Sequence, residues 1–422
     1  MFVDIEHRVS LYSASGQATD PPYHKSHNAR RPCTTSQAPL VSVGPQPPPS
    51  MGDRWYFAGL NASAVIRTGN LQGGRADIRS LTPIPDLTPK LDEEVDVLFA
   101  CWSQVVFRSG DRLLLRGFRA GSVDDITASN ITSLIGDHNG ISGALDRHGN
   151  VYLADTQALR DVDAPLTLPL VSHEDSPRLA KVSVAGNFRV AVAIRPAPGA
   201  TTTHVEEFRD LASFRRWYSD PANPQNYPAK HHQIGGRIKQ IISNSKVFVC
   251  LTEAGQVLTW GDPRHGGLGR TTTQPGDVPA AQPGLLTTLD GIRIIKVSGG
   301  GQMFAALSED KAVYIWSGAE QRSQSGLTVC REAQGDQMAL VDILDEEGEP
   351  YDFEDLAVGH GHILLRTTDG KVYAAGDNTN GQLGIGSEDT YRSDFVKIVS
   401  GGCSSIRAAS KSSVIRATMP PN

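Results

Sequence analysis

A glycine-rich stretch, GKVYAAGDNTNGQLGIG (370–386), has a composition that could cradle a phosphate group. A phosphate-binding loop needs Lys and then Ser or Thr directly after its last glycine, at the start of a helix. Here Gly386 is followed by Ser and Glu. A dinucleotide-binding turn needs the order G-x-G-x-x-G, whereas Gly381, Gly384 and Gly386 have the reverse spacing. The stretch therefore predicts neither kind of phosphate chemistry.

Side chains that bind metals or act as nucleophiles do not recur at the spacings that such chemistry needs. The five cysteines are far apart, which argues against a zinc module and against a disulfide scaffold. No G-x-S-x-G elbow is present, since GISGA (140–144) is one residue too short. We therefore predict no enzyme activity, no metal and no cofactor. The histidine pairs, none of which has an H-x-x-x-H or H-E-x-x-H frame, are His24/His27, His231/His232 and His360/His362.

An acidic run, DEEGEPYDFED (345–355), has seven carboxylate residues in eleven. Such a run is either a solvated loop between repeats or a negative patch that steers a basic partner. A histone tail and the basic surface of a GTPase are examples of such partners. On the second interpretation, Glu346, Glu347 and Asp352 are candidate partner-binding residues.

A second candidate lies in the segment THVEEFRDLASFRRWYSD (203–220). Thr203 and Glu206 have capping-box spacing, and apolar residues from Val205 to Tyr218 recur at helical spacing. The segment is therefore expected to form a helix, which either caps its own repeat or docks a partner. Aromatic residues beside arginines are enriched at interface hot spots. The candidate residues for docking are Phe208, Arg215, Arg216, Trp217 and Tyr218.

These segments lie within a repeat that runs along most of the chain. Each unit has an apolar run, a small-residue turn, a second apolar run, a charged turn and a third strand that ends in Gly. Weaker units begin near Val95, Ile131 and Leu179, and a last unit (FVKIVSGGCSSIRAASKSSVIRA) lacks its Gly-terminated strand. The three clearest units are IKQIISNSKVFVCLTEAGQVLTWGD, IIKVSGGGQMFAALSEDKAVYIWSG and FEDLAVGHGHILLRTTDGKVYAAGD.

The missing strand is found at the other end of the repeat array. RWYFAGLNASAV (54–65) matches the A-G-x-N of the clearest units, and its addition makes seven units. A ring closed in this way has no open sheet edge. We therefore predict an all-β, seven-bladed β-propeller closed by an N-terminal strand, with one short helical insertion at 196–234. Glycines 299–301 and 359–361 are expected near the crowded central axis, with the rings of His360 and His362 near one mouth of the channel.

Composition and charge set further limits. The chain has 422 residues and a formal net charge of −6, which disfavours direct nucleic-acid binding. No apolar run approaches the roughly 20 residues of a membrane span, and the first residues lack a signal-peptide core. We expect an intracellular monomer in the nucleus or cytoplasm. Residues 1–50 are predicted to be a disordered tail, 51–418 the propeller, and 419–422 a short tail.

Two segments, GQVLTWGDPRHGGLGR (255–270) and GKVYAAGDNTNGQLGIG, resemble the repeat of the regulator of chromosome condensation family, whose fold is a seven-bladed propeller. The similarity covers about 54–418 and is strong in units four to six. The N-terminal closing strand and the insertion before unit four resemble the branch of small, single-propeller proteins called regulator of chromosome condensation domain-containing protein. Members of that branch are adaptors, linked in animals to a Jumonji-type oxygenase and in fungi to tubulin function.

The resemblance also implies an alternative function. The best-known family member is a guanine-nucleotide exchange factor for the small GTPase Ran, and it uses acidic residues, a histidine and a protruding β-wedge. The position of the typical repeat histidine is occupied here by Val247, Met303 and His362 in units four to six. This variation does not indicate a shared active centre. We therefore predict a non-catalytic scaffold that binds a chromatin- or cytoskeleton-linked protein on one propeller face or on the 203–228 insertion, with the exchange factor as the alternative.

Overall fold

The structure is a computed structural model, and it divides into two units, Met1–Ser50 and Met51–Asn422. All described residues lie in the second unit, so the predicted tails at 1–50 and 419–422 lie outside them. The described residues are 54–61, 65, 77–84, 95–102, 104–117, 121–123, 130–137, 140–154, 166–172, 174–264, 267–317, 326–332 and 338–418.

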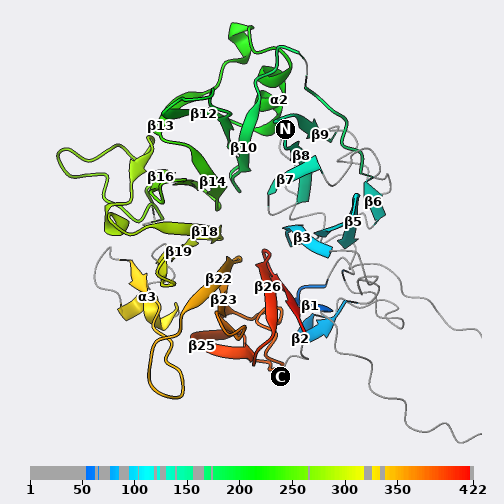
Figure 1. The fold of residues 1–422 in the computed structure, drawn as a ribbon, viewed down its shortest axis with the longest axis vertical. Coiled ribbons are helices and arrows are strands. Elements are labelled where there is room, and N and C mark those ends of the chain that lie inside the picture. The colour runs from blue at the N-terminus through cyan, green and yellow to red at the C-terminus, as the bar shows by residue number, and fades with distance from the viewer. Residues whose placement is uncertain are drawn as a thin grey trace, which may run out of the picture. The chain divides into compact units, whose positions relative to one another are not determined.

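Seven antiparallel sheets form the second unit, and their innermost strands surround a central channel (Figure 1). Each inner strand contacts the inner strand of the next sheet, and β26 contacts β3, so the ring is closed. The predicted seven-bladed propeller is confirmed. From the innermost strand outward, the blades are β3 (Val95–Ala100), β4 (Gln104–Ser109), β5 (Arg112–Gly117), β6 (Gly121–Val123); β7 (Ile131–Asp137), β8 (Gly140–Asp146), β9 (Val151–Leu153); β10 (Leu179–Val184), β11 (Val190–Ile194), β12 (Thr202–Phe208), β13 (Lys230–Gly235); β14 (Ile238–Ser243), β15 (Val247–Thr252), β16 (Val257–Gly261), β17 (Gly284–Leu285); β18 (Ile294–Gly300), β19 (Met303–Ser308), β20 (Val313–Ser317), β21 (Ala339–Leu340); β22 (Phe353–Val358), β23 (His362–Thr367), β24 (Val372–Asp377), β25 (Tyr391–Val399); and β26 (Cys403–Ala408), β27 (Ser412–Ala417), β1 (Arg54–Gly59), β2 (Ile78–Pro83).

The second strand of a blade is the most buried element of the repeat. Every residue of β15 and of β19 is buried, because neighbouring blades cover both faces of these strands. A strand buried on both faces reads as a continuous apolar run rather than as an alternating one. This explains the runs VFVCLT and MFAALS, which carried the repeat signal in the sequence.

The last blade closes the ring by combining both ends of the propeller. β1 pairs with β27 from Arg54 opposite Ala417 to Gly59 opposite Ser412. The closing strand predicted at the N-terminus is therefore confirmed. The structure adds that β2 pairs with β1, so the N-terminal part supplies two strands of this blade rather than one.

Glycine ends the third strand of several blades because another backbone lies against it. In β24, Gly376 has a φ of +105°, and a Cβ there would lie 2.2 Å from the carbonyl oxygen of Gly361. In the closing strand, Gly59 has a φ of +121°, and its Cβ would lie 2.4 Å from the carbonyl oxygen of Lys411. Only glycine adopts this backbone conformation readily and tolerates this approach. The glycine-rich stretch of the sequence is thus a blade corner, and Leu383 beneath it is fully buried.

The predicted helical insertion is correct in kind but wrong in its limits. Residues 202–208 form β12, which pairs with β11 on one side and β13 on the other. Pairing on both edges outweighs the helical periodicity of this short segment. The predicted Thr203–Glu206 capping box is accordingly absent, because the Thr203 hydroxyl donates to the Gly236 carbonyl. The helices are α2 (Leu211–Ser219) and α3 (Thr328–Glu332), with single 3₁₀ turns at η2 (Pro224–Asn226) and η4 (Thr287–Leu289). Among the described residues, no helix is long and apolar enough to cross a membrane.

Helix α2 begins at its own capping box, which involves Asp210 and Ser213. The Asp210 carboxylate accepts a hydrogen bond of 2.7 Å from the Ser213 amide, and the Asp210 amide donates to the Ser213 hydroxyl. We expect Asp210→Ala to lower the free energy of unfolding by about 1 kcal/mol. Chemical denaturation measures this change. An Asp210→Asn variant keeps an accepting oxygen and should lose less, and equal losses in both variants would contradict the capping role.

Candidate functional site

The aromatic residues proposed for docking are part of the core. Phe208, Trp217 and Tyr218 are 1%, 6% and 0% exposed, and they pack with Phe214 against the second and third blades. The Tyr218 hydroxyl lies 2.7 Å from the Ser172 hydroxyl, which fixes α2 to the second blade. These rings form no exposed surface, so the docking interpretation of Phe208, Trp217 and Tyr218 is corrected. Helix α2 covers its own blade.

The two arginines of α2 differ in their surroundings. The Arg215 guanidinium donates to the carbonyl oxygens of Leu153 at 3.0 Å and Ala154 at 2.6 Å. Arg215 therefore connects the helix to the second blade. Arg216 is exposed in the last turn of the helix.

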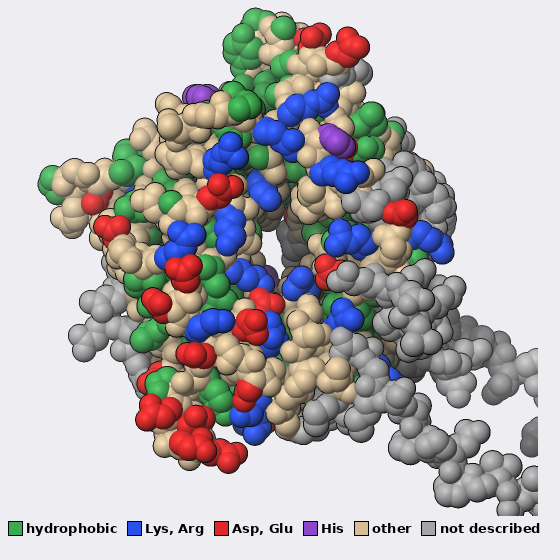
Figure 2. All heavy atoms as spheres, in the orientation of Figure 1, with side chains coloured by type: hydrophobic (Ala, Val, Ile, Leu, Met, Phe, Trp, Pro, Cys, Tyr) green, Lys and Arg blue, Asp and Glu red, His purple; other side chains and the backbone are tan. Residues whose placement is uncertain are grey.

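The acidic run divides into a loop and a strand. Its first part belongs to a hairpin between the fifth and sixth blades, which we call the acidic hairpin (residues 342–352). Asp345 shapes its tip, because its carboxylate accepts from the amides of Glu347 at 3.0 Å and Glu349 at 2.9 Å. Glu346, Glu347 and Asp352 are exposed. Figure 2 shows acidic side chains gathered at the lower left, over the loop that precedes β22 in Figure 1.

The second part of the run lies in β22 and is not part of that surface. Glu354 pairs with Arg366 at 3.1 Å. Asp355 pairs with Lys296 of the fifth blade and is only 14% exposed. The acidic run therefore offers a partner its hairpin residues, while its last two carboxylates stabilise the wall of the ring.

A buried carboxylate that sequence reasoning missed is Glu207 of β12. It is 2% exposed and binds the Arg189 guanidinium, the Lys230 ammonium at 3.6 Å and the Trp260 indole at 3.0 Å. Burial opposes its ionisation, but the hydrogen bonds from His232 and Arg189 and the charges of Arg189 and Lys230 lower its pKa to about 2. Because Trp260 belongs to β16, this cluster fastens the third blade to the fourth. Reading 202–208 as a strand would have placed Glu207 beside Lys230.

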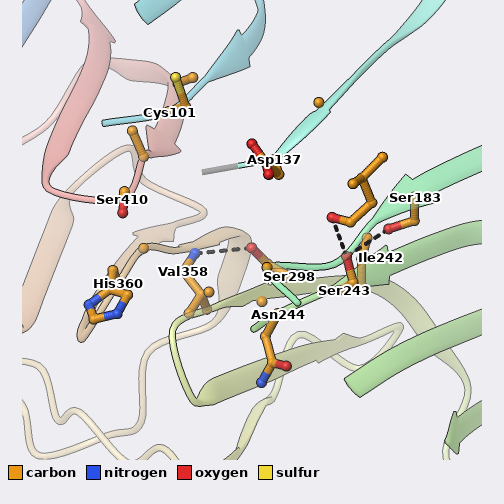
Figure 3. Close-up of a pocket in the computed structure, with 18 of the residues that line it drawn as sticks. Cys101, Asp137, Ser183, Ile242, Ser243, Asn244, Ser298, Val358, His360 and Ser410 are labelled. Atoms are coloured by element: carbon orange, nitrogen blue, oxygen red, sulfur yellow. Dashed lines mark hydrogen bonds between the residues drawn. The ribbon is translucent and has the colours of Figure 1, made fainter. Parts of the chain in front are cut away.

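The central channel holds a cavity of about 580 Å³, lined by the turns that join first and second strands (Figure 3). The glycines predicted near the axis, Gly299–Gly301 and Gly359, line it. Neighbouring inner strands are bridged across its wall, since the Ser243 hydroxyl donates to the Val184 carbonyl and the Val358 amide donates to the Ser298 hydroxyl.

The two histidines assigned to the channel mouth separate. His360 lines the cavity and is exposed. His362 begins β23 and is fully buried, with its ring 3.2 Å from the Ser413 hydroxyl of the closing blade. Burial lowers the pKa of His362 to about 4, so the ring is neutral near pH 7. The expectation of a channel position is wrong for His362, because the side chain of that strand position faces the next blade.

The cavity is lined by hydroxyls, amides and glycines together with Asp137 and His360. Within the described part of the chain, no three His, Cys, Asp or Glu side chains are grouped so that they could hold a metal ion. The chemistry that the ring offers is therefore recognition by hydrogen bonds and charge.

Family models match three segments of the chain. The description "Regulator of chromosome condensation (RCC1) repeat" applies to residues 254–307 and 369–402 in one model and 353–382 in another. The "E3 ubiquitin-protein ligase HERC2" of Homo sapiens is 33% identical over 144 residues, or 33% of this chain and 3% of that protein.

Two mouse relatives match over similarly limited segments. The "Regulator of chromosome condensation" of Mus musculus is 32% identical over 32% of this chain and 30% of its own length. The "RCC1 domain-containing protein 1" of Mus musculus is 39% identical over 19% of this chain and 20% of its own. The chain thus matches less than a third of the length of each of these relatives.

Solved structures extend the likeness to the whole ring. Prp20p from Saccharomyces cerevisiae, reported with "Its Binding Properties to Gsp1p and Histones", superimposes with a TM-score of 0.61 at 12% identity. The match covers 86% of this chain and 91% of that one, which establishes a common fold. Seven closed blades, the glycine-ended third strands and the matching repeats together place the chain in the regulator of chromosome condensation repeat family.

Proposed function

We propose that this propeller is a non-catalytic scaffold that binds a protein partner, and that the acidic hairpin is a docking surface for a basic segment of that partner. The observation that carries the proposal is a preformed hairpin whose exposed carboxylates stand beside exposed apolar side chains. Exposed charge steers a partner of opposite sign, and exposed apolar groups mark interaction surfaces.

The hairpin is shaped before any partner arrives. Leu344 pairs with Pro350 across it, and the Asp345 amide donates to the Glu349 carbonyl at 2.8 Å. A preformed loop loses less conformational entropy on binding than a disordered one. Leu340 and Leu344, each 54% exposed, supply apolar contacts next to the carboxylates. This pattern suits a segment with Lys or Arg flanking an apolar side chain, as in chromatin- or cytoskeleton-associated proteins.

The test uses a labelled peptide of alternating Lys and Leu as a basic probe, measured by fluorescence anisotropy at low salt. The triple variant Glu346→Gln, Glu347→Gln, Glu349→Gln should bind it about tenfold more weakly, since each exposed charge pair contributes about 0.5 kcal/mol. Native partners captured from cells should be lost with the same variant.

The matched control is Glu253→Gln, Glu309→Gln, Asp310→Asn, which removes three exposed acidic charges from turns of the fourth and fifth blades. Its affinity should stay within about twofold of the parent. Equal weakening in both triple variants would mean that net charge, not the acidic hairpin, attracts the probe, and the docking proposal would then fail.

The alternative is a guanine-nucleotide exchange factor for a Ran-like GTPase. The name of one relative, a regulator of chromosome condensation, and the report of Gsp1p binding by Prp20p support it. The measurement is the release of labelled nucleotide from Ran with catalytic amounts of the full chain. Acceleration would replace the scaffold proposal, whereas an unchanged rate would remove the alternative.

A further inference from the structure

Cationic side chains gather at one opening of the channel. We call the face at which the inner strands begin the front face, which is the face seen in Figure 2. Lys and Arg side chains surround the opening there, while the densest group of acidic side chains lies at the edge. The inner strands of the third, fourth, fifth and seventh blades contribute Lys181, Lys239, Lys296 and Arg407, which we call the basic rim.

The rim positions are related by the repeat. Lys181 in β10 and Lys296 in β18 each follow an irregularity in the pairing register, two residues after the start of their strand. Lys239 of β14 lies at such an irregularity and reaches the next blade, where its ammonium donates to the Ile295 carbonyl at 2.7 Å. Equivalent positions in successive blades lie at one level around the channel, so the ring brings these cations together.

Carboxylates at the rim neutralise only part of this charge. Asp355 serves two cations, because it pairs with Lys296 and lies 3.9 Å from Arg407. Arg407 also lies 3.9 Å from Asp96 of the first blade, which in turn pairs with Arg108 at 3.7 Å. The pKa of Lys296 is lowered, first by burial and then by Arg407 and Arg366, against the opposing effect of Asp355.

Two rim cations have no acidic partner. Neither Lys181 nor Lys239 forms an ion pair with any carboxylate among the described residues. Lys181 is partly exposed and Lys239 is exposed. The rim therefore carries uncompensated positive charge in a chain whose formal net charge is −6.

We propose that the basic rim binds a short acidic peptide segment of a partner protein. The carboxylates of such a segment would lie against Lys181 and Lys239 at the opening of the channel. Charge concentrated around a concave opening of limited area suits a short segment.

The surroundings of the rim distinguish this occupant from nucleic acid. Turns at the outer part of the front face carry Glu253, Glu309 and Asp310, all exposed, and the acidic hairpin stands at its edge. A long polyanion that crosses the face would meet these like charges, which disfavour it. A peptide of a few residues contacts the opening alone.

The probe is a fluorescein-labelled peptide of eight glutamates, titrated with the full chain at low salt and followed by anisotropy. We expect saturable binding that weakens as salt rises. The double variant Lys181→Gln, Lys239→Gln should weaken it about tenfold. Failure of the peptide to bind would overturn the proposal, and so would tighter binding of a labelled DNA duplex with eight phosphates.

The control variant is Lys246→Gln, Lys411→Gln, which removes the same charge from exposed turns on the opposite face. It should change the affinity by less than about twofold. An equal loss in both variants would show attraction by net charge alone and would also overturn the proposal. Melting temperatures verify that all variants fold. The hairpin and rim variants differ, so either proposal can fail without the other.

Discussion

A chain that begins at residue 61 is expected to be unfolded at 25 °C, because it lacks β1. This strand supplies the pairing edge for both β27 and β2. Its Trp55 and Phe57 are 2% and 0% exposed within the cluster that joins the last blade to the first. The loss of each large buried aromatic costs about 3–5 kcal/mol, and a whole domain has only about 5–15 kcal/mol of stability. Circular dichroism and thermal melting measure the outcome.

The matched truncation removes residues 1–50 alone, which form a unit separate from the propeller. We expect its melting temperature to stay within a few degrees of the full chain, since β1 remains in place. If both truncations melted alike, the last blade would not depend on its N-terminal strands, and closure of the ring would not be what stabilises the fold.

Replacing Glu207 is expected to be the most costly single substitution of a charged residue. Glu207→Ala leaves Arg189, Lys230 and His232 without their buried counter-charge and removes the acceptor of the Trp260 indole. Breaking one side of a buried ion pair costs about 3–5 kcal/mol. Urea denaturation at pH 7 should show this loss. Glu309→Ala, which breaks an exposed pair with Arg293, should cost less than about 1 kcal/mol.

The same carboxylate predicts a pH dependence. Its folded-state pKa of about 2 lies below the ordinary 4.5, so the ionised group stabilises the fold above about pH 4.5. This contribution is lost as the pH falls from about 4.5 toward 2. The parent should therefore lose more stability than Glu207→Gln over this interval. Parallel losses in the two proteins would contradict an ionised Glu207 in the folded state.

The fold was predictable because its main determinants are local and repeated. VFVCLT and MFAALS are continuous apolar runs because each is covered on both faces. Gly59 and Gly376 mark the same corner in two blades, where a Cβ would collide with a neighbouring backbone. The match of Gly59 to Gly376 was sufficient to predict closure of the ring from the sequence.

The candidate site was less predictable, because exposure is a property of the assembled ring. Glu346 and Glu347 are exposed, as the acidic run suggested, yet Asp355 ten residues into the same run pairs with Lys296 of another blade. The Lys residues that begin units three to five are visible in LAKVSV, IKQIIS and IIKVSG. Their gathering around one opening follows only when the blades are placed in a circle.

The sequence by itself determined the architecture of this protein: seven repeated units, glycine corners and a last blade completed from the N-terminal side. Tertiary structure alone decided the state of Thr202–Phe208, which has helical periodicity but is held as a strand by pairing on both edges. It also decided that Trp217 and Tyr218 are core residues rather than a docking surface. The physical reason is that repeat and turn signals arise from contacts close in sequence, whereas burial and charge pairing arise between blades.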